Sequence, residues 1–501
     1  ASLDSRKVRK LLRPYGVSLF ALNLDLSWDM NRWSRLCGLV LLLSHALMHS
    51  ANAGFCTPTP GSCWPSRSTF SAWLATLSST TRVYTPDTTP EFFLSEATSM
   101  NLLKSNFPGL IVVPGTEADL RSAMYFASKN RIRVVARCSG HDFNGRSNGR
   151  GVMLIKTELL NWTLYDDKTQ AISFGSGAMH ADIYSALVPY NRVYIGGQSK
   201  TVCPAGCLAG GCHGLMSRQY GLGIDSILEI RFALFNGTVI TLNRTRNADL
   251  FHAYLGAGQN SFGVALSFKA QTYPAPPAIL MFDALFDATA DNAPGNLLSN
   301  FFLNATWFND MPRELAGNIN YEFGSVKVKF VYTGTDYDGT FQKLQPLLES
   351  PFTRHVTDPE VFPNMYEVAL NLYPPVTDIW ARKFITSGFL PQDQEVLDTI
   401  SSIIVVLFGA QWFDPHEDRD RVAGMEPYLS GLYSLAPTSY SNEFTSWGTY
   451  NNVSDWKTRF FSNYDSLLAV KKKYDPCNLM TAKFAVGSDQ PTAICSCAPK
   501  G

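Results

Sequence analysis

A turn of small and polar residues that carries one histidine follows a short apolar run near position 135. Its members are Arg137, Cys138, Ser139, Gly140, His141, Asp142, Gly145 and Ser147. Such a turn, directly after a strand, can present several backbone N–H groups to a pyrophosphate. Gly140 lets the backbone approach a ligand closely, and His141 stands at the point of closest approach. The alternative interpretation is an ordinary polar loop with a hydrogen-bonded histidine.

A second stretch, residues 202–214, is rich in glycine and alanine. It holds four glycines and two alanines, and the glycines are Gly206, Gly210, Gly211 and Gly214. So much glycine is hard to reconcile with the interior of a packed helix or strand, because glycine weakens both. The composition favours backbone that lies flat along a cofactor.

Residues 30–53 have the three parts of a secretory signal peptide. A basic start at residues 31–35 precedes an apolar stretch at 36–48 and a small-x-small cleavage site at 51–53. Residues 1–29 lie upstream of it and have an unclear status. Five N-x-[ST] sequons agree with export, at Asn161, Asn236, Asn243, Asn304 and Asn452. We therefore expect a secreted glycoprotein, with a signal anchor as the alternative.

The cysteines allow two interpretations. Cys203, Cys207, Cys212 and His213 have the residue types of a metal site, but their spacing lacks the paired C-x2-C knuckles of common zinc sites. An exported chain also favours disulfides over thiolate clusters. We predict no metal, and we expect a local disulfide between Cys56 and Cys63.

Short apolar runs and one amphipathic helix position these segments. Strand patterns at residues 109–113 and 132–135 flank a helix that opens at residue 116, which is a β-α-β unit and favours parallel pairing of its two strands. The apolar positions of this helix are Leu120, Ala123, Met124 and Ala127. Further strand patterns lie at residues 152–155, 171–174, 227–234 and 264–268.

A proline-rich joint at residues 273–277 precedes a second domain. Residues 278–435 combine strand-like alternation at 326–330 and 403–408 with longer helical patterns, which predicts an antiparallel sheet with helices on one face. The last segment is helical over 464–473, and we interpret its lysine run, 471–473, as a solvated helix end. The predicted fold class is α+β.

Charge balance excludes some partners. The chain has 501 residues, with 42 basic and 42 acidic side chains, so it lacks the basic footprint of a nucleic-acid-binding protein. We expect neither a nucleic-acid partner nor, after signal cleavage, a membrane partner.

Taken together, these segments resemble the berberine bridge enzyme-like family of FAD-linked oxidases, of the vanillyl-alcohol-oxidase or PCMH type, and above all its secreted fungal-type members. The landmarks are residues 63–66, 140–147, 218–225, 463–464, 470–476 and 486–488. A weaker similarity covers residues 249–264. The resemblance implies a two-part FAD-binding domain at 54–275, an inserted substrate domain at 276–440, and a C-terminal segment at 441–501 that completes the flavin site.

The resemblance also implies FAD attached to the ring of His141. Further implied cofactor-binding positions are Ser199, Gly221, Asp225, Asn463 and Asn478. Many relatives carry a second, thioether link from a cysteine at the position of Ser199, and a hydroxyl cannot replace that thiolate. Cys203 is the alternative for the second link, and single attachment through His141 is the expectation.

The implied activity is oxidation of an alcohol, sugar or amine carbon by hydride transfer to the flavin. Residues 439–443 resemble a family segment that supplies the base, and on a strand Tyr440 and Asn442 would share a face. We predict Tyr440 as base, Asn442 as its orienting partner, and dioxygen as acceptor with hydrogen peroxide as product. The alternatives are a dehydrogenase with another acceptor, a flavin-binding protein without oxidase activity, and the metal-stabilised extracellular protein.

Overall fold

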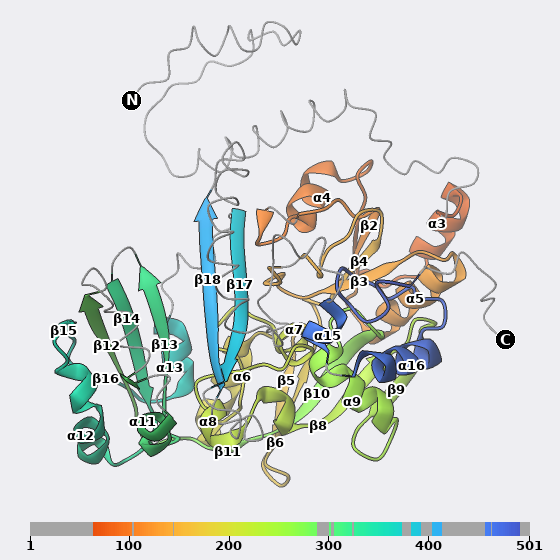
Figure 1. Ribbon diagram of the computed structural model, residues 1–501. Coiled ribbons are helices and arrows are strands. Elements are labelled where there is room, and N and C mark those ends of the chain that lie inside the picture. Colours follow the sequence, from red (N-terminus) through yellow and green to blue (C-terminus); the bar gives the residue numbers. More distant parts are fainter. Residues whose placement is uncertain are drawn as a thin grey trace, which may run out of the picture. The chain divides into compact units, whose positions relative to one another are not determined.

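The computed structural model describes residues 64–102, 105–143, 145–287, 300–301, 305–322, 325–372, 382–391, 403–412, 456–461 and 463–490. All of them belong to one compact unit, Pro58–Gly501 (Figure 1). The predicted signal peptide, Cys56, Cys63, Tyr440 and Asn442 lie outside the described residues. The predicted domain boundaries also stay predictions. Within the described part of the chain, no helix is long and apolar enough to cross a membrane.

The first sheet follows the predicted β-α-β pattern. Its strand order is β1(Arg82–Tyr84), β2(Leu110–Val113), β4(Met153–Lys156), β3(Val134–Arg137), and helix α5(Glu117–Lys129) joins β2 to β3. The four apolar positions predicted for this helix are fully buried, and Thr116 caps it by accepting the N–H of Asp119 at 3.1 Å. The predicted direct pairing of β2 with β3 is wrong, because the fully buried β4 lies between them and pairs in parallel with both.

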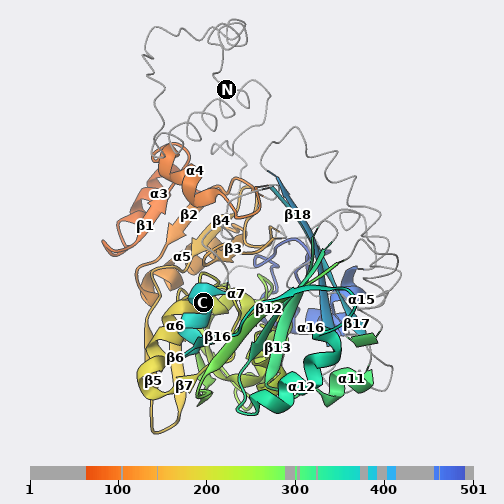
Figure 2. The same ribbon diagram turned by 90° about the vertical axis from the view of Figure 1, so that its left-hand side faces the viewer.

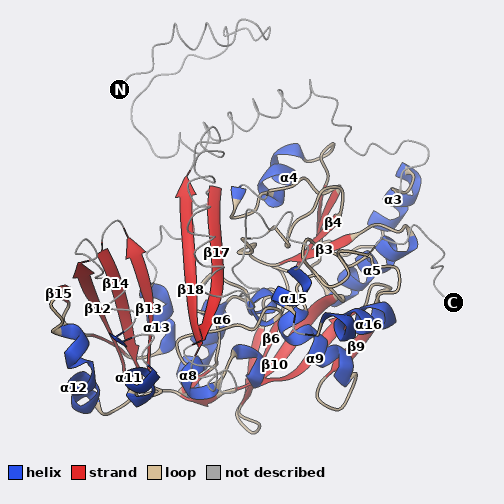
Figure 3. Ribbon diagram, viewed as in Figure 1, coloured by secondary structure: helices blue, strands red, loops and turns tan. Residues whose placement is uncertain are grey.

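The second sheet is antiparallel and contains the other strands predicted before residue 270. Its order is β5(Thr163–Asp166), β6(Ala171–Gly175), β10(Val264–Gln271), β8(Ile227–Ala233), β9(Val239–Leu242). Helices α6(His180–Leu187), α9(Ala248–Ala257) and α16(Tyr464–Tyr474) share its hydrophobic core. Figure 3 shows this sheet and its helices by secondary structure.

The third sheet confirms the predicted antiparallel arrangement after the proline-rich joint. Strands β13(Leu315–Glu322), β14(Ser325–Tyr332), β12(Ile279–Asp287) and β15(Thr353–Val356) pair in that order, and β16(Glu360–Phe362) also pairs with β12 (Figure 2). Helix α12(Tyr337–Leu348) packs on one face, where Phe282 and Phe286 point. The alternate residues Ile279 and Met281 pack with α13(Met365–Asn371) into the core of the second sheet. A separate hairpin pairs β17(Arg382–Pro391) with β18(Ile403–Trp412).

The lysine run of α16 differs from its prediction. Lys471 is only 1% exposed, and its ammonium group donates to the Asp475 carboxylate at 2.6 Å and to the carbonyl oxygens of Ser261 and Met480. The interpretation of the whole run as a solvated helix end is therefore wrong for Lys471. It holds for Lys473, which is exposed and pairs with Asp249 at 2.6 Å. A period of 3.6 residues places neighbours in a run on different sides of a helix, which is why their environments diverge.

Candidate functional site

A cavity of about 360 Å³, partly open to solvent, lies between two segments that the sequence singled out. We call residues 137–143 and 145–147 the histidine wall, and residues 196–214 the glycine wall. The predicted cofactor-binding residues that line the cavity are Arg137, Cys138, Ser139, Gly140, His141, Asp142, Ser147, Ser199 and Gly206. The structure thus brings nine of the predicted positions together around one space.

Arg137 anchors the start of the histidine wall, where β3 ends. Its buried guanidinium donates to the carbonyl oxygens of Ala97 at 3.3 Å, of Thr98 at 3.1 Å and of Glu96. These carbonyls belong to the C-terminal end of helix α4(Pro90–Ala97), which lacks intrahelical partners there. Burial lowers the pKa of Arg137 to about 10, so the side chain still carries its charge at neutral pH. Arg137 therefore holds the wall in place by its charge.

The carboxylate of Asp142 folds the turn after His141. It accepts hydrogen bonds from Arg146 Nε at 3.0 Å and Nη2 at 2.9 Å, and from the backbone N–H groups of Arg146 and Ser147. Arg146 is itself 3% exposed, so this is a nearly buried ion pair with a two-pronged geometry. Gly140 has φ of +83°, a conformation that residues with a Cβ rarely adopt. Asp142 thus serves the shape of the turn that carries His141.

Asn260 binds the histidine wall from the turn before β10, and sequence reasoning missed it. Its side-chain oxygen accepts the N–H of Ala136 at 2.6 Å, and its NH₂ group donates to the carbonyls of Ala136 at 3.1 Å and Arg146 at 2.9 Å. Asn260 has φ of +53°, which asparagine tolerates better than most residues. The available signal was weak: an asparagine within a glycine-rich segment.

Two disulfides shape the glycine wall. Cys138 pairs with Cys203, which joins the two walls across a Cα–Cα distance of 6.1 Å, and Cys207 pairs with Cys212 within the glycine wall. The proposed thioether role of Cys203 is therefore wrong, because its sulfur is already bonded. The two pairs also use all three cysteines of the metal interpretation, so those sulfurs are not thiolate ligands.

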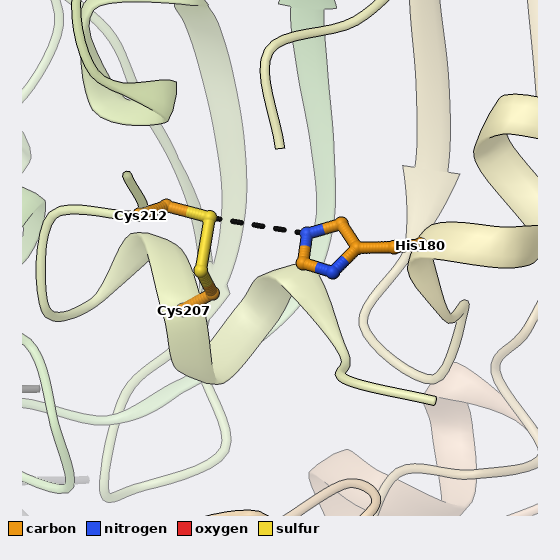
Figure 4. Close-up of side chains that lie close together, drawn as sticks. All are labelled: His180, Cys207 and Cys212. Atoms are coloured by element: carbon orange, nitrogen blue, oxygen red, sulfur yellow. Dashed lines mark hydrogen bonds between the residues drawn. A yellow bond between two sulfur atoms is a disulfide. The ribbon is translucent and has the colours of Figure 1, made fainter. Parts of the chain in front are cut away.

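His180 lies behind the glycine wall and faces the second disulfide (Figure 4). Its Nε2 atom lies 3.8 Å from Cys212 Sγ and accepts the N–H of Gly197 at 2.9 Å. Complete burial lowers the pKa of His180 to about 3, so the ring is neutral at neutral pH. Because Nε2 is an acceptor, the proton of the neutral ring is on Nδ1. His180 supports the wall as a neutral hydrogen-bond acceptor.

His141 reaches across the cavity to the glycine wall. Its Nε2 atom lies 2.8 Å from Thr201 Oγ1, and Thr201 Oγ1 lies 3.4 Å from Ser199 Oγ. The hydrogen bond orients the imidazole ring, which a bare polar loop would not do. This geometry suits a histidine that must hold a ligand at a fixed position.

Unpaired polar atoms around the cavity show that FAD fits this site. Ser147 Oγ, Ser176 Oγ and Gln259 Oε1 are buried and have no hydrogen-bond partner among the described residues, yet all three residues line the cavity. Buried polar atoms are nearly always paired, so these are positions for ligand contacts. A dinucleotide offers the phosphate, ribityl and ring groups that would pair with them.

The remaining predicted positions do not line the cavity. They are Gly145, Gly210, Gly211, Gly214, Gly221, Asp225, Asn463 and Asn478. Some have evident structural roles: Asp225 accepts the N–H of Leu222 at 2.7 Å, and Asn478 donates to the Gly487 carbonyl at 2.8 Å. At Gly214 a Cβ would overlap the carbonyl oxygen of Gly196, so this glycine allows a close backbone approach. Their contact with flavin stays a prediction, as do the roles of Tyr440 and Asn442.

The third sheet reaches the cavity through an amide pair that was also missed. Asn318 of β13 donates to Gln198 Oε1 at 2.9 Å, and both residues line the cavity. Nearby, Arg218 donates to the carbonyls of Leu315 at 2.7 Å and Pro312 at 3.2 Å. Gln198 of the glycine wall therefore contacts the third sheet, and His213 also lines the cavity.

Comparison with known proteins identifies this arrangement. A family model described as "FAD binding domain" matches residues 108–243, and one described as "Berberine and berberine like" matches residues 439–486. Both matches are to segments of berberine bridge enzyme-like, FAD-linked oxidoreductases, which this chain resembles. The first match covers both walls of the cavity, and the second covers the segment that holds Tyr440.

Two fungal FAD-linked proteins illustrate the similarity. The FAD-linked oxidoreductase ffsJ of Aspergillus flavipes is 33% identical over 200 residues, which is 38% of this chain and 32% of that protein. The VAO-type flavoprotein oxidase VAO615 of Thermothelomyces thermophilus is 25% identical over 457 residues, 77% of each protein. The chain thus matches about a third of the first relative and about three quarters of the second.

Solved structures confirm the predicted α+β fold of the berberine bridge enzyme-like family. The BBE-like 1 protein of Physcomitrella patens has a TM-score of 0.73 at 20% identity, over 83% of this chain and 98% of its own. A xylooligosaccharide oxidase from Myceliophthora thermophila C1, in complex with xylobiose, has a TM-score of 0.68 at 19% identity, over 81% and 96%.

Proposed function

We propose that this protein is a secreted oxidase that holds FAD covalently through His141 and oxidises an alcohol, sugar or amine carbon of a small molecule, with dioxygen as acceptor. The observation that carries the proposal is the position of His141. It is oriented by Thr201 at 2.8 Å inside a cavity where three buried polar atoms have no hydrogen-bond partner among the described residues. When bound, FAD supplies the acceptor for a hydride and transfers electrons to dioxygen, which yields hydrogen peroxide.

The chain's own residues divide the remaining tasks. The histidine wall, tied down by Arg137 and Asp142, presents His141 and the backbone of residues 138–140 to the cofactor. Ser147, Ser176 and Gln259 supply polar atoms that the fold leaves unpaired.

Proton removal from the substrate needs a base, and we assign it to Tyr440 with Asn442 as its orienting partner. The support is the family match over residues 439–486, together with the two-residue spacing of Tyr440 and Asn442, which would place both on one face of a strand. A neutral phenol has a pKa of about 10, so an active base requires a local environment that favours the phenolate. Exchange of Tyr440 for phenylalanine should therefore lower turnover and leave flavin content unchanged.

Export is supported by the residues around three sequons. Asn161 is exposed, and Asn236 and Asn243 lie partly exposed in turns where their side-chain oxygens accept the N–H of the residue two positions later, at 3.0 and 2.9 Å. Two disulfides among the described residues fit an oxidising compartment. Glycan mapping by mass spectrometry of protein secreted by a eukaryotic host checks this part of the proposal.

The decisive experiment compares the wild type with a His141→Ala variant. The wild type should be yellow, should keep its flavin after acid precipitation, and should yield a peptide around His141 with added flavin mass. Anaerobic mixing with a panel of alcohols, sugars and amines should bleach the flavin, and air should restore the colour with release of peroxide. His141→Ala should lose the acid-stable flavin.

Other outcomes select the alternatives. Flavin that bleaches anaerobically but regains colour only with an added acceptor would identify a dehydrogenase. Flavin that no member of the panel bleaches would favour a binding protein without oxidase activity.

A further inference from the structure

Two links cross the cavity between its walls, and they lie close together along both segments. The hydrogen bond joins His141 to Thr201 at 2.8 Å. The disulfide joins Cys138, three residues before His141, to Cys203, two residues after Thr201. In each wall, the residues that form the two links therefore lie within a stretch of four residues.

The disulfide is packed into the cavity lining. Both cysteines line the cavity, and Cys203 is 4% exposed. Their sulfurs lie 3.5 and 3.9 Å from the carbonyl oxygen of Gly177. The bridge is thus a fixed point beside His141, with Cys203 buried and Cys138 partly buried.

Residues between the bridge and His141 have little rigidity of their own. Ser139 and Gly140 separate Cys138 from His141, and Gly140 adopts the left-handed conformation that glycine enters freely. Without the covalent link, the segments that carry His141 and Thr201 could move more freely relative to one another. A cross-link restricts that motion before the ligand binds, which lowers the entropy cost of aligning the ring.

We propose that the Cys138–Cys203 disulfide is a brace that holds His141 against Thr201, and that flavin retention at His141 depends on it. The two cysteines are positioning residues, since they act through His141. This inference rests on the proposed flavin attachment and adds a structural requirement for it. Among the described residues, the brace directly joins the segments that the cavity otherwise separates.

The second disulfide is a matched control. The Cys207–Cys212 disulfide borders the same cavity through Cys207, but it joins residues five positions apart within one wall. The brace joins residues 65 positions apart, one in each wall. Loss of either pair removes two sulfurs from the cavity region. Only loss of the brace removes the covalent link between the walls.

The test compares full-length wild type, Cys138→Ser/Cys203→Ser and Cys207→Ser/Cys212→Ser, all secreted by one host. We expect the brace variant to retain at most a tenth of the wild type's acid-stable flavin. The acid-stable flavin content of the control variant should stay within twofold of the wild type. Equal retention in both variants would overturn the proposal. An equal loss in both would also overturn it, because the effect would then not be specific to the bridge between the walls.

A second measurement covers a brace variant that fails to fold. The folded, loaded wild type is treated with a phosphine reductant, and alkylation with mass spectrometry identifies which bridge opens. Opening of the brace should shift the visible absorption bands of the bound flavin. Opening without any shift would contradict the brace.

Failure of the proposed function has a different signature. In that case the wild type retains no flavin in acid, and His141→Ala behaves like the wild type. The brace is then tested by the rate at which diethyl pyrocarbonate modifies the imidazole ring of His141. A rate in the brace variant that equals that of the control variant would overturn it, and a faster rate would support it.

Discussion

The two walls of the cavity are held in place by different kinds of bonds. The histidine wall depends on charged and amide side chains: Arg137 caps helix α4, Asp142 binds Arg146, and Asn260 spans Ala136 and Arg146. The glycine wall has few such contacts. It is shaped by two disulfides, by a close backbone approach at Gly214, and by the neutral ring of His180.

This difference indicates how each wall should respond to change. Hydrogen bonds from buried charges are lost when one polar side chain is removed, and the buried groups left without a partner cannot bind water instead. A wall of close backbone contacts tolerates loss of polar groups but not added volume, and a neutral buried histidine makes it sensitive to acid. The following predictions test this division, from the largest expected effect to the smallest.

The largest effect is expected for Arg137→Leu in the histidine wall. The change leaves the carbonyls of residues 96–98 without their donor, and we expect a loss of about 4 kcal/mol in the free energy of unfolding. Chemical denaturation measures it. Arg82→Leu is the control, because Arg82 forms an exposed pair with Glu158 and should cost less than about 1 kcal/mol. A small effect at Arg137 would contradict the charge-based account of this wall.

In the glycine wall, Gly214→Ala should lower the free energy of unfolding by about 3 kcal/mol. The new methyl group overlaps the Gly196 carbonyl oxygen, so the backbone of one of the two residues must move. Gly206→Ala is the matched control in the same wall. No atom lies within 4 Å of a Cβ at Gly206, which is in the short helix α7(Pro204–Leu208), so alanine should be neutral or stabilise by about 0.5 kcal/mol. Thermal unfolding of both variants decides; equal effects would show that steric approach is not what shapes the wall.

Acid should weaken the glycine wall through His180. The folded pKa of His180, about 3, lies below the ordinary value of 6.5, because burial disfavours the charged ring. Between these values the unfolded chain takes up a proton that the folded chain does not. His180 therefore contributes stability that is fully present above pH 6.5 and is lost as the pH falls toward 3, at up to about 1.4 kcal/mol per pH unit.

In His180→Gln, the free energy of unfolding should fall less steeply with decreasing pH than in the wild type. Denaturant unfolding at pH 7, 5.5 and 4.5 measures this dependence. The exposed His252→Gln serves as control and should keep the wild-type dependence. An unchanged slope in His180→Gln would assign the acid sensitivity to other groups.

The smallest effect is expected at the contact between the walls. Thr201→Val removes the hydroxyl bonded to His141 at nearly constant volume. The free energy of unfolding should fall by about 1 kcal/mol, as measured by chemical denaturation. Ser199→Ala removes only the longer contact at 3.4 Å and should cost less. A larger loss from Ser199→Ala than from Thr201→Val would reverse the roles assigned to these two hydroxyls.

Local patterns predicted much of the fold and the centre of the site. Leu120, Ala123, Met124 and Ala127 form the buried face of α5 because helical periodicity alone determines which positions share a side. The glycine-rich turn around His141 lines the cavity because a turn after a parallel strand must lie at the sheet edge.

What the sequence did not predict depends on contacts between distant residues. The insertion of β4 between β2 and β3, and the pairing of Cys138 with Cys203, both join segments whose proximity no local pattern encodes. Asn260 gave almost no signal, because its function comes from two carbonyls and an N–H more than 100 residues away. The burial of Lys471 was likewise hidden within a run of three identical residues.

The contact of Lys471 with Ser261 has a consequence for biosynthesis. The two residues are 210 positions apart, and Ser261 directly follows Asn260, which clamps the histidine wall. A chain emerging from the ribosome can form both of its first two sheets long before residue 471 is made. Closure of the cofactor pocket must therefore wait until residue 471 has been made, and the order of synthesis separates folding of the scaffold from closure of the site.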